Sequence, residues 1–434
     1  MGVTETTASE LVPGQIVELT VGDVAHGGIF VARHESGRVV FVSDALPGER
    51  VEVRVAEVKK RFARGETLRV LEAAPERQEH VWAAASLDRA PEDRAGGAEF
   101  GHTLPEFGRE LKRRVLADAM VRFGGVDADG ALLGELEVAG LPGDDESRGT
   151  GWRTRLTLHV DADKRVGPYA ARSHRIVDVD DLPLAFSDIE ESALAEIRAG
   201  SRSPGHIDFV APADHEVHLL RRPDAKPARA AGIVHERVHD FAFDVNEDGF
   251  WQIHRAAATT LFDAVGEALD REHFDVAAQH LDLYGGVGLL GAALAAAAGE
   301  PGIRLESVEV AEEATAHAAA NLARWEGTSA VTSAVDRYLR GLATTADASL
   351  RESLAAGTVV LDPPRSGAKA PVIDALAALE PQQLIYVACD PVALGRDTGL
   401  LRERGYELTR LRAFDLFPNT HHVEAVATFI RAAH

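Results

Sequence analysis

Residues 280–291 read His280-Leu-Asp-Leu-Tyr-Gly-Gly-Val-Gly-Leu-Leu-Gly, and this stretch decides the fold of the C-terminal half. An apolar strand ends near Asp282, a glycine turn follows, and a helix begins near Leu289. Glycines at such a turn let the backbone approach a bound nucleotide closely. No Lys-Ser or Lys-Thr follows the glycines, which excludes a phosphate-binding P-loop. From about residue 236 onward, apolar strands alternate with Ala- and Leu-rich helices, which predicts a doubly wound α/β domain.

Acidic residues stand where two further strands of this domain end. The strand Leu305-Glu-Ser-Val-Glu ends in Glu309, which is placed to accept both ribose hydroxyls of an adenosine cofactor. The run Val359-Val-Leu-Asp-Pro-Pro-Arg delivers Asp362 to the carboxyl end of a buried strand, where ligands bind in such sheets. Two prolines then make the turn rigid.

Two residues near the C-terminus have the chemistry of a nucleophile and a base. Cys389 closes the strand Gln383-Leu-Ile-Tyr-Val-Ala and is followed by Asp390 and Pro391, so it lies at a strand-to-loop exit. A lone buried cysteine is more often inert packing, but at such an exit a thiol is both accessible and rigidly aimed. Glu424 opens an apolar closing strand, a setting that raises a carboxyl pKa and suits proton abstraction.

The first 75 residues predict a small β-barrel of the oligonucleotide-binding type, with short strands between 16 and 72 separated by Gly and Pro turns. Residues 51–69 place basic side chains among apolar ones, as a groove for a phosphate backbone needs, although a barrel without a ligand fits equally well. A helix from Pro105 to Phe123 is expected to carry basic residues on its exposed side: Arg109, Lys112, Arg113 and Arg114. The predicted domains are therefore a barrel (1–75), a central α+β region (76–235) and the α/β domain (236–434).

The central region carries no motif with a chemical meaning of its own. Its basic and histidine residues face either RNA or ordinary solvent: Arg153, Arg155, Arg172, His174 and Arg175. A third basic cluster follows at Arg221, Arg222, Lys226 and Arg229.

Composition limits the function classes further. The 434 residues carry a formal net charge of −23, which argues against indiscriminate nucleic-acid binding but leaves local basic patches open. The single cysteine excludes an intramolecular disulfide framework and an iron–sulfur cluster held by several cysteines of this chain. No metal site is predicted. The chain start lacks the pattern of a secretory signal and no long apolar run occurs, so we expect a cytoplasmic protein with no membrane partner.

Taken together, these strings resemble the RNA uracil-C5 methyltransferase family, and the resemblance covers nearly the whole chain. The matching strings are Phe250-Trp-Gln-Ile-His, Asp282-Leu-Tyr-Gly-Gly-Val-Gly, Val308-Glu309, Asn321, Asp362-Pro-Pro-Arg, Cys389-Asp-Pro and Phe417-Pro-Asn-Thr-His-His-Val-Glu. The resemblance implies a Rossmann-like methyltransferase domain and identifies the N-terminal barrel with the TRAM domain of many members.

Residue roles follow from the resemblance position by position. It implies that four residues contact S-adenosylmethionine: Gln252, Tyr284, Glu309 and Asp362. It implies that Cys389 is the nucleophile and Glu424 the general base. The sequence departs from the family at Gly285, where members usually have Cys, and at Ala388, where they have Ser. It also lacks the cysteines of the members that hold an iron–sulfur cluster, so no cluster is expected.

The resulting hypothesis is methylation of a uridine C5 in RNA, with ribosomal RNA favoured over transfer RNA, by a monomeric enzyme. Cys389 attacks C6, C5 takes the methyl group, and a base removes the C5 proton. We expect Arg365 to supply a positive field for the thiolate, and the uridine to flip out of its stack. The first alternative is an adenine-N6 methyltransferase, although an aromatic residue would then be expected where Arg365 stands. The second is a non-catalytic RNA-binding protein.

Overall fold

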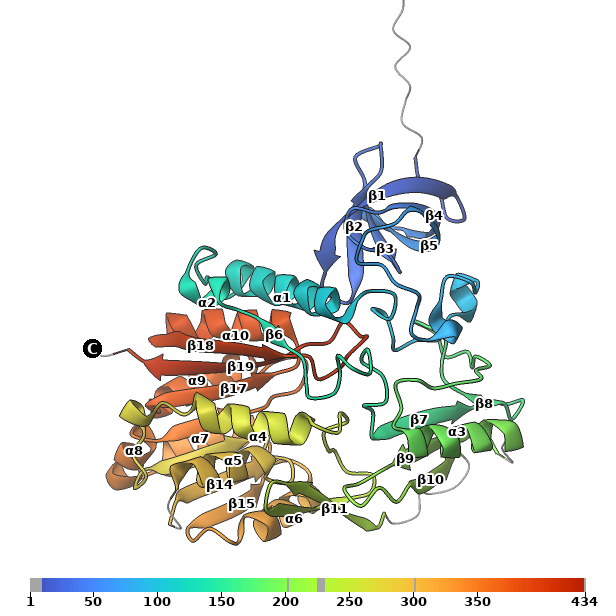
Figure 1. The fold of residues 1–434 in the computed structure, drawn as a ribbon. Coiled ribbons are helices and arrows are strands. Elements are labelled where there is room, and N and C mark those ends of the chain that lie inside the picture. The colour runs from blue at the N-terminus through green and yellow to red at the C-terminus, as the bar shows by residue number, and fades with distance from the viewer. Residues whose placement is uncertain (1–9, 201–202, 225–230, 300–301, 433–434) are drawn as a thin grey trace, which may run out of the picture.

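The computed structural model describes residues 10–200, 203–224, 231–299 and 302–432. Lys226 and Arg229 of the third basic cluster lie outside these residues. Figure 1 shows the N-terminal barrel and the central sheet on the same side of a larger C-terminal α/β domain. Within the described residues, no helix is long and apolar enough to cross a membrane.

The predicted N-terminal barrel is confirmed. It is closed in the order β1-β2-β3-β5-β4, and its strands are β1 (Ile16–Ala25), β2 (Ile29–Arg33), β3 (Val39–Ser43), β4 (Arg50–Val58) and β5 (Phe62–Glu72). Alternate residues such as Val40, Val51 and Val53 are buried inside it, as the period of two requires. Many basic side chains on its surface pair with acids, for example Arg50 with Glu18, so the predicted RNA groove on the barrel stays a prediction.

The connector after the barrel joins the core of the central region. It contains two short turns, η1 (Ala83–Ala85) and η2 (Pro91–Asp93). The central sheet has the order β10-β9-β7-β8, with β7 (Arg155–Val160), β8 (Val166–Gly167), β9 (Gly205–Val210) and β10 (His218–Pro223), and α3 (Ser187–Ala199) packs on it. Trp82 of the connector shares one apolar cluster with Trp152 and Phe209.

The C-terminal domain is built on an eight-stranded sheet of order β15-β14-β13-β16-β17-β19-β18-β6. Its strands are β13 (Gln279–Leu283), β14 (Arg304–Glu309), β15 (Thr328–Thr332), β16 (Thr358–Leu361), β17 (Gln383–Ala388), β18 (Tyr406–Phe414), β19 (Glu424–Arg431) and β6 (Val138–Ala139). The five strands from β13 to β17 are parallel, and β19 pairs antiparallel with β17. The predicted doubly wound α/β class is confirmed.

Helices flank this sheet, as Figure 1 shows. They are α4 (Ala257–Ala268), α5 (Leu289–Ala298), α6 (Glu312–Leu322), α7 (Val335–Thr345), α8 (Ala348–Ala355), α9 (Lys369–Leu379) and α10 (Pro391–Glu403), with a short turn η3 (Arg271–His273). The hairpin of β11 (Ile233–Val238) and β12 (Phe241–Asn246) packs on α6. There the Asn321 Oδ1 accepts a hydrogen bond from the Asp244 amide at 2.9 Å.

Part of the region between the barrel and the central sheet joins the C-terminal sheet. Helix α1 (Pro105–Arg122) packs along α10, and after α2 (Ala131–Gly134) the strand β6 extends the sheet beside β18. Leu116 and Met120 of α1 belong to the apolar core beneath that sheet. The three-domain division remains a prediction, and this contact comes from long-range packing that local patterns do not encode.

The expected exposed face of α1 is wrong at Lys112. This side chain is 2% exposed, and its Nζ donates to Asp415 Oδ1 at 2.5 Å and to the Phe417 carbonyl at 3.0 Å. Burial lowers the pKa of Lys112, against the opposing effect of Asp415. A helix that lies between a barrel and a sheet has more than one buried face, which its own periodicity cannot reveal.

Candidate active site

The glycine turn after β13 begins the site. Tyr284 has a φ of 62°, and Gly286 and Gly288 have φ values of 55° and 90°, so the chain turns through left-handed backbone there. Asn321 donates from Nδ2 to the Val287 carbonyl at 2.9 Å and holds the turn from α6. The turn therefore has a set shape before any ligand arrives.

Glu309 closes the turn from the next strand. Its carboxylate accepts the Gly286 amide at 3.1 Å, and those of Val310 and Ala311 at 2.7 and 2.8 Å. These backbone bonds orient the carboxylate at the end of β14. The arrangement agrees with the position predicted for a ribose-binding acid.

A cavity of about 370 Å³ opens beside these residues at the carboxyl ends of the parallel strands. Its lining includes Tyr284, Glu309, Val310, Asp336 and Pro364. The Val310 side chain is 68% exposed, which leaves an apolar face free inside a partly acidic cavity. Asp336 was not identified as a candidate from the sequence motifs. Its signal is an acidic residue in the first turn of the helix after β15.

Of the four predicted cofactor residues, Tyr284 and Glu309 line this cavity, whereas Asp362 and Gln252 do not. Gln252 is half-buried in the connection that leads to α4. Its neighbour Trp251 shares an apolar cluster with Val287 and Leu289, which places the connection close to the glycine turn. Its role in cofactor binding stays a prediction.

Cys389 and Glu424 lie opposite each other because of the strand register. β17 and β19 run antiparallel, with Ala388 paired to Ala425. The residue after Ala388 therefore faces the residue before Ala425, at the same edge of the sheet as Asp362. Cys389 is partly exposed, whereas Glu424 is 5% exposed. The sheet thus brings the predicted nucleophile and base together.

Burial controls the charge of this group. It raises the pKa of Asp362 to about 7, with a further rise from Asp282, and raises that of Glu424 well above its ordinary value, with a further rise from Asp362. The pKa of the Cys389 thiol rises to about 12 through burial and then through the charges of Glu424 and Asp362. Arg365 acts in the opposite direction on the thiol, as expected, but is outweighed. The resting site therefore holds a thiol and not a thiolate.

The loop that leads to Glu424 is held from three sides. Lys112 binds it from α1, and Asn419, with a φ of 63°, donates from Nδ2 to the Gly149 carbonyl at 2.6 Å. The Phe100 amide of the connector donates to the Asn419 carbonyl at 2.9 Å. The string Phe417-Pro-Asn-Thr-His-His thus ties the start of β19 to the central region.

A turn of the barrel touches the two loops that carry Cys389 and Glu424. His26 Nε2 lies 2.9 Å from Asp390 Oδ2, directly after Cys389. Gly28, with a φ of 69°, packs so closely that a Cβ there would lie 2.7 Å from the Cβ of His421. Asp390 also caps α10, accepting the Ala393 amide at 2.8 Å. The barrel is therefore docked onto the edge of the sheet that carries the site.

Comparison with known proteins identifies this arrangement. The TRAM domain profile matches residues 11–68, and that of the family described as tRNA (Uracil-5-)-methyltransferase matches residues 233–432. An uncharacterised RNA methyltransferase of Streptomyces avermitilis is 36% identical, over 97% of this chain and 99% of its own. The chain belongs to the RNA uracil-C5 methyltransferase family. Its resemblance to that family, its barrel as a TRAM domain and its dependence on S-adenosylmethionine are thereby confirmed.

Two other relatives of this uracil-C5 methyltransferase have more specific names. The 23S rRNA (uracil(1939)-C(5))-methyltransferase RlmD of Chromohalobacter salexigens is 30% identical, over 95% of this chain and 89% of its own. The crystal structure of Pyrococcus abyssi tRNA (uracil-54, C5)-methyltransferase, in complex with S-adenosyl-L-homocysteine, aligns with a TM-score of 0.67 at 19% identity. It covers 95% of this chain and 99% of that one, so the two share the whole fold.

The departure from the family at Gly285 has a local cause. A Cβ at Gly285 would lie 2.1 Å from Ser307 Oγ and 2.6 Å from Asp282 Oδ2. Ser307 donates to Asp282 at 2.9 Å through that same oxygen. The Ser307 hydroxyl occupies the space that a side chain at 285 would need, so a cysteine there requires Ser307 to rotate away.

The residues around the cavity fit a cofactor that is cationic and carries hydroxyl groups. Asp282 Oδ1 is buried without a hydrogen-bond partner in the described structure, and Asp362 and Glu309 add two further acids. A buried orphan oxygen is costly unless a ligand or water reaches it. S-adenosylmethionine, with a sulfonium and two ribose hydroxyls, matches this chemistry.

Proposed function

We propose that this enzyme methylates C5 of a uridine in ribosomal RNA through a covalent bond between Cys389 Sγ and C6 of the ring. The observation that carries the proposal is the pairing of Ala388 with Ala425, which sets Cys389 against Glu424 at the carboxyl edge of the sheet. A nucleophile and a base that face each other beside a cofactor cavity suit addition and elimination on one ring.

The reaction begins at the thiol. Cys389 loses its proton and its sulfur bonds to C6, which makes C5 electron-rich. S-adenosylmethionine supplies the methyl group that C5 takes. Glu424 then removes the C5 proton, and the electron pair of that C–H bond expels the sulfur from C6. The product is 5-methyluridine, and Cys389 leaves as a thiolate, which takes up a proton again in place of the one it lost to solvent at the start, while Glu424 gives the C5 proton to solvent.

The charges around Cys389 make its deprotonation the demanding step. Burial and three carboxyl groups, those of Glu424, Asp362 and Asp390, hold the pKa of the thiol at about 12, so Arg365 is the group that favours the thiolate. Positive charge in the cofactor cavity acts in the same direction, because it offsets the carboxylate of Asp362. We therefore propose that the nucleophile is activated only in the loaded enzyme.

Four side chains are proposed to hold the cofactor. Glu309 receives the ribose hydroxyls, and Tyr284 packs along the cavity that both of them line. Asp362, directly after β16, faces the sulfonium end. Gln252 approaches from the connection before α4. Asp336 is a further candidate, because it also lines the cavity and carries a carboxylate.

Ribosomal RNA is preferred because a relative named as a 23S rRNA enzyme is 30% identical over nearly the whole chain. Transfer RNA is the second candidate, since the matching family description names it. Mass-spectrometric mapping of 5-methyluridine in RNA from cells with and without this gene separates the two. We further propose a cytoplasmic monomer.

The covalent step is tested by Glu424→Gln. The amide keeps the shape of the carboxylate but accepts no proton, so elimination stalls after methyl transfer. A methylated RNA–protein adduct is expected to survive denaturing electrophoresis, and to vanish in the Cys389→Ala, Glu424→Gln double variant. An adenine methyltransferase or a non-catalytic RNA-binding protein forms no adduct. Normal product release by Glu424→Gln would remove Glu424 from the mechanism.

A further inference from the structure

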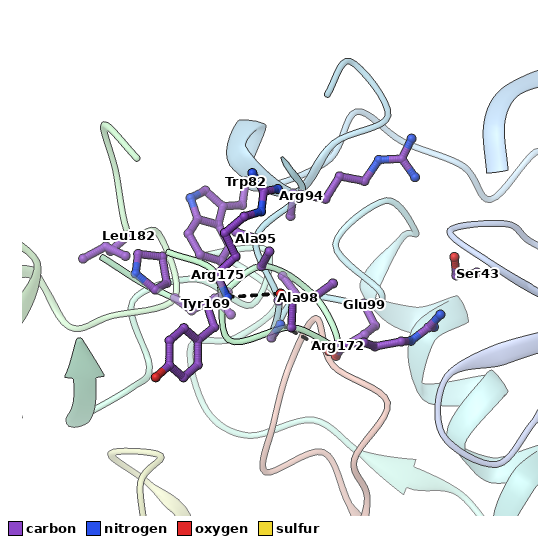
Figure 2. Close-up of a pocket in the computed structure, with 18 of the residues that line it drawn as sticks. Ser43, Trp82, Arg94, Ala95, Ala98, Glu99, Tyr169, Arg172, Arg175 and Leu182 are labelled. Atoms are coloured by element: carbon purple, nitrogen blue, oxygen red, sulfur yellow. Dashed lines mark hydrogen bonds between the residues drawn. The ribbon is translucent and has the colours of Figure 1, made fainter. Parts of the chain in front are cut away.

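A second cavity, larger than the cofactor cavity, lies between the barrel, the connector and the central sheet (Figure 2). Its volume is about 830 Å³, within the range of about 300–1,000 Å³ typical of ligand sites. Residues of all three regions line it, among them Ser43, Arg94 and Tyr169. We call it the interdomain cleft.

The interdomain cleft adjoins the catalytic site. Two of its lining residues, Gly28 and Glu99, contact His421. His421 Nδ1 lies 3.4 Å from Glu99 Oε2 and precedes Glu424 by three positions in the chain. A polymer that enters the catalytic pocket with one unit can therefore place neighbouring units in this cleft.

An aromatic stack stands on the cleft wall. The Tyr169 ring lies parallel to that of His159, with centroids 3.6 Å apart and an interplanar angle of 5°. The His174 ring lies perpendicular to that of Tyr169, with centroids 5.2 Å apart and an interplanar angle of 86°. Such a flat platform receives an unstacked nucleobase, whose faces all have the π character needed for stacking.

Two arginines in the cleft carry unneutralised charge. Among the described residues, neither Arg153 nor Arg172 forms an ion pair, whereas Arg94 pairs with Asp44 at 2.9 Å. Arg153 donates from Nε to the Arg155 carbonyl at 2.8 Å, and its burial lowers its pKa. A shielded guanidinium without a carboxylate is stabilised by an incoming anion.

Each acidic residue that lines the cleft lies next to a basic side chain. Asp44 pairs with Arg94, and both Glu66 and Glu92 pair with Arg54. Glu99 faces His421. Glu99 also acts on Arg153, so Arg172 is the arginine of the cleft with the least opposing charge among the described residues, in a chain whose net charge is −23.

We propose that the interdomain cleft binds single-stranded nucleotides of the substrate RNA next to the target uridine, with a base on Tyr169 and phosphates on Arg153 and Arg172. This inference rests on RNA being the substrate, as proposed above. An enclosed cleft with a stacking platform admits splayed bases but not an A-form helix, whose bases remain stacked inside. The substrate segment is thus unpaired where it meets the enzyme.

The test measures binding of a short fluorescein-labelled oligouridine and of a blunt RNA duplex. Tyr169→Ala should weaken oligouridine binding about tenfold, the loss of one base–aromatic stack. Arg172→Gln should lower the slope of log affinity against log salt by about 0.7, the loss of one phosphate contact. Arg165→Gln is the matched control, since Arg165 pairs with Asp161 at 2.8 Å and does not line the cleft.

Calorimetric affinity for S-adenosylmethionine should stay unchanged in all three variants, which verifies their folding. Wild-type enzyme should bind the duplex more weakly than the oligouridine. Oligouridine binding by Tyr169→Ala and Arg172→Gln equal to that of Arg165→Gln would overturn the proposal, as would equal affinity for the duplex. Absence of 5-methyluridine would instead defeat the proposed function and leave the binding result standing.

Discussion

Charge and burial at single residues set the chemistry of this site. Asp282, Asp362 and Glu424 are acids with little access to water, and burial raises the pKa of each. Neighbouring acids add to the rise, because Glu309 raises the pKa of Asp282 and Asp282 raises that of Asp362. A pocket of this kind holds protons when it is empty and gives them up when a cation enters.

Cofactor affinity should therefore depend on pH through Asp362. Its pKa lies at about 7, and only its ionised form attracts a sulfonium. Affinity for S-adenosylmethionine is expected to rise with pH up to about 7, by about tenfold per unit below that value, and then to level off. Calorimetry across this range checks the slope. In Asp362→Asn the dependence should flatten, and a wild-type slope in that variant would assign the titration to another group.

The same pKa shift has a consequence for stability. A carboxyl group whose pKa is raised by folding binds more protons in the folded than in the unfolded state between about pH 4 and about pH 7. The stabilising contribution of Asp362 is thus complete below the unfolded pKa and is lost as pH rises through the folded one. The unliganded enzyme should gain stability on mild acidification over that window.

Lys112 is a single residue on which the catalytic loop depends. Lys112→Met leaves the carboxylate of Asp415 buried without its partner, which costs about 3–5 kcal/mol. Urea unfolding should show this loss. Arg113→Met is the control on the same helix, because Arg113 forms a half-exposed pair with Glu110, worth about 0–1 kcal/mol. Equal losses in the two variants would mean that the Lys112 pair is solvated.

At the scale of elements, α10 connects the nucleophile to the packing of α1. Asp390 caps the helix directly after Cys389, and Gly395 faces α1 one turn later. A Cβ at Gly395 would lie 2.5 Å from the Ala119 carbonyl oxygen. The close approach of the two helices thus depends on glycine.

Gly395→Ala should lower both stability and methyl transfer, because α10 must shift and carry Cys389 with it. The atom that the added Cβ would meet at 2.5 Å belongs to the backbone of Ala119, so no flexible side chain can move aside. Gly341→Ala is the matched control in α7, where no atom lies within 4 Å of the added Cβ. That change should stabilise the helix by up to about 1 kcal/mol. Thermal unfolding together with a tritium-methyl assay measures both effects, and an active, stable Gly395→Ala would contradict the coupling.

At the scale of the whole molecule, the barrel is part of the catalytic architecture. Its β1–β2 turn reaches Asp390 through His26 and His421 through Gly28. These contacts join a domain of the RNA-binding kind to the two loops that present Cys389 and Glu424. We therefore expect RNA binding at the barrel and the alignment of Cys389 and Glu424 to be coupled through this interface.

His26→Ala should lower kcat while leaving affinity for S-adenosylmethionine unchanged, since His26 contacts Asp390 and not the cofactor cavity. Asp23→Ala is the control, near the end of β1 and three residues before His26. It breaks the 3.3 Å contact with Arg114 on α1 and touches neither catalytic loop. If the two variants lose activity equally, His26 serves only to dock the barrel. Rescue by His26→Gln would support the hydrogen bond to Asp390.

Local patterns were sufficient for much of the fold. Alternating residues between 16 and 72 predicted the barrel, and the strand, glycine turn and helix at 280–291 predicted the α/β domain, because these signals depend on neighbours in sequence. The ends of the parallel strands also placed Glu309, Asp362 and Cys389 at one edge of a sheet.

Other features could not be predicted in this way, because they arise between distant segments. The burial of Lys112 depends on Asp415, about three hundred positions away, and the attachment of β6 to β18 leaves no trace in local periodicity. Likewise, burial raises the pKa of the Cys389 thiol by more than Arg365 lowers it, and this burial follows from how the strands enclose Cys389.

The sequence by itself determined the fold class and the family and predicted the reactive side chains, since each is encoded in a short motif. Only the tertiary structure decided that Cys389 faces Glu424, that the barrel turn meets both loops, and that Tyr169 and Arg172 share a cleft with the barrel. The physical reason is that register and docking are set by packing summed over many residues. No single segment of the chain contains all of those packing contacts.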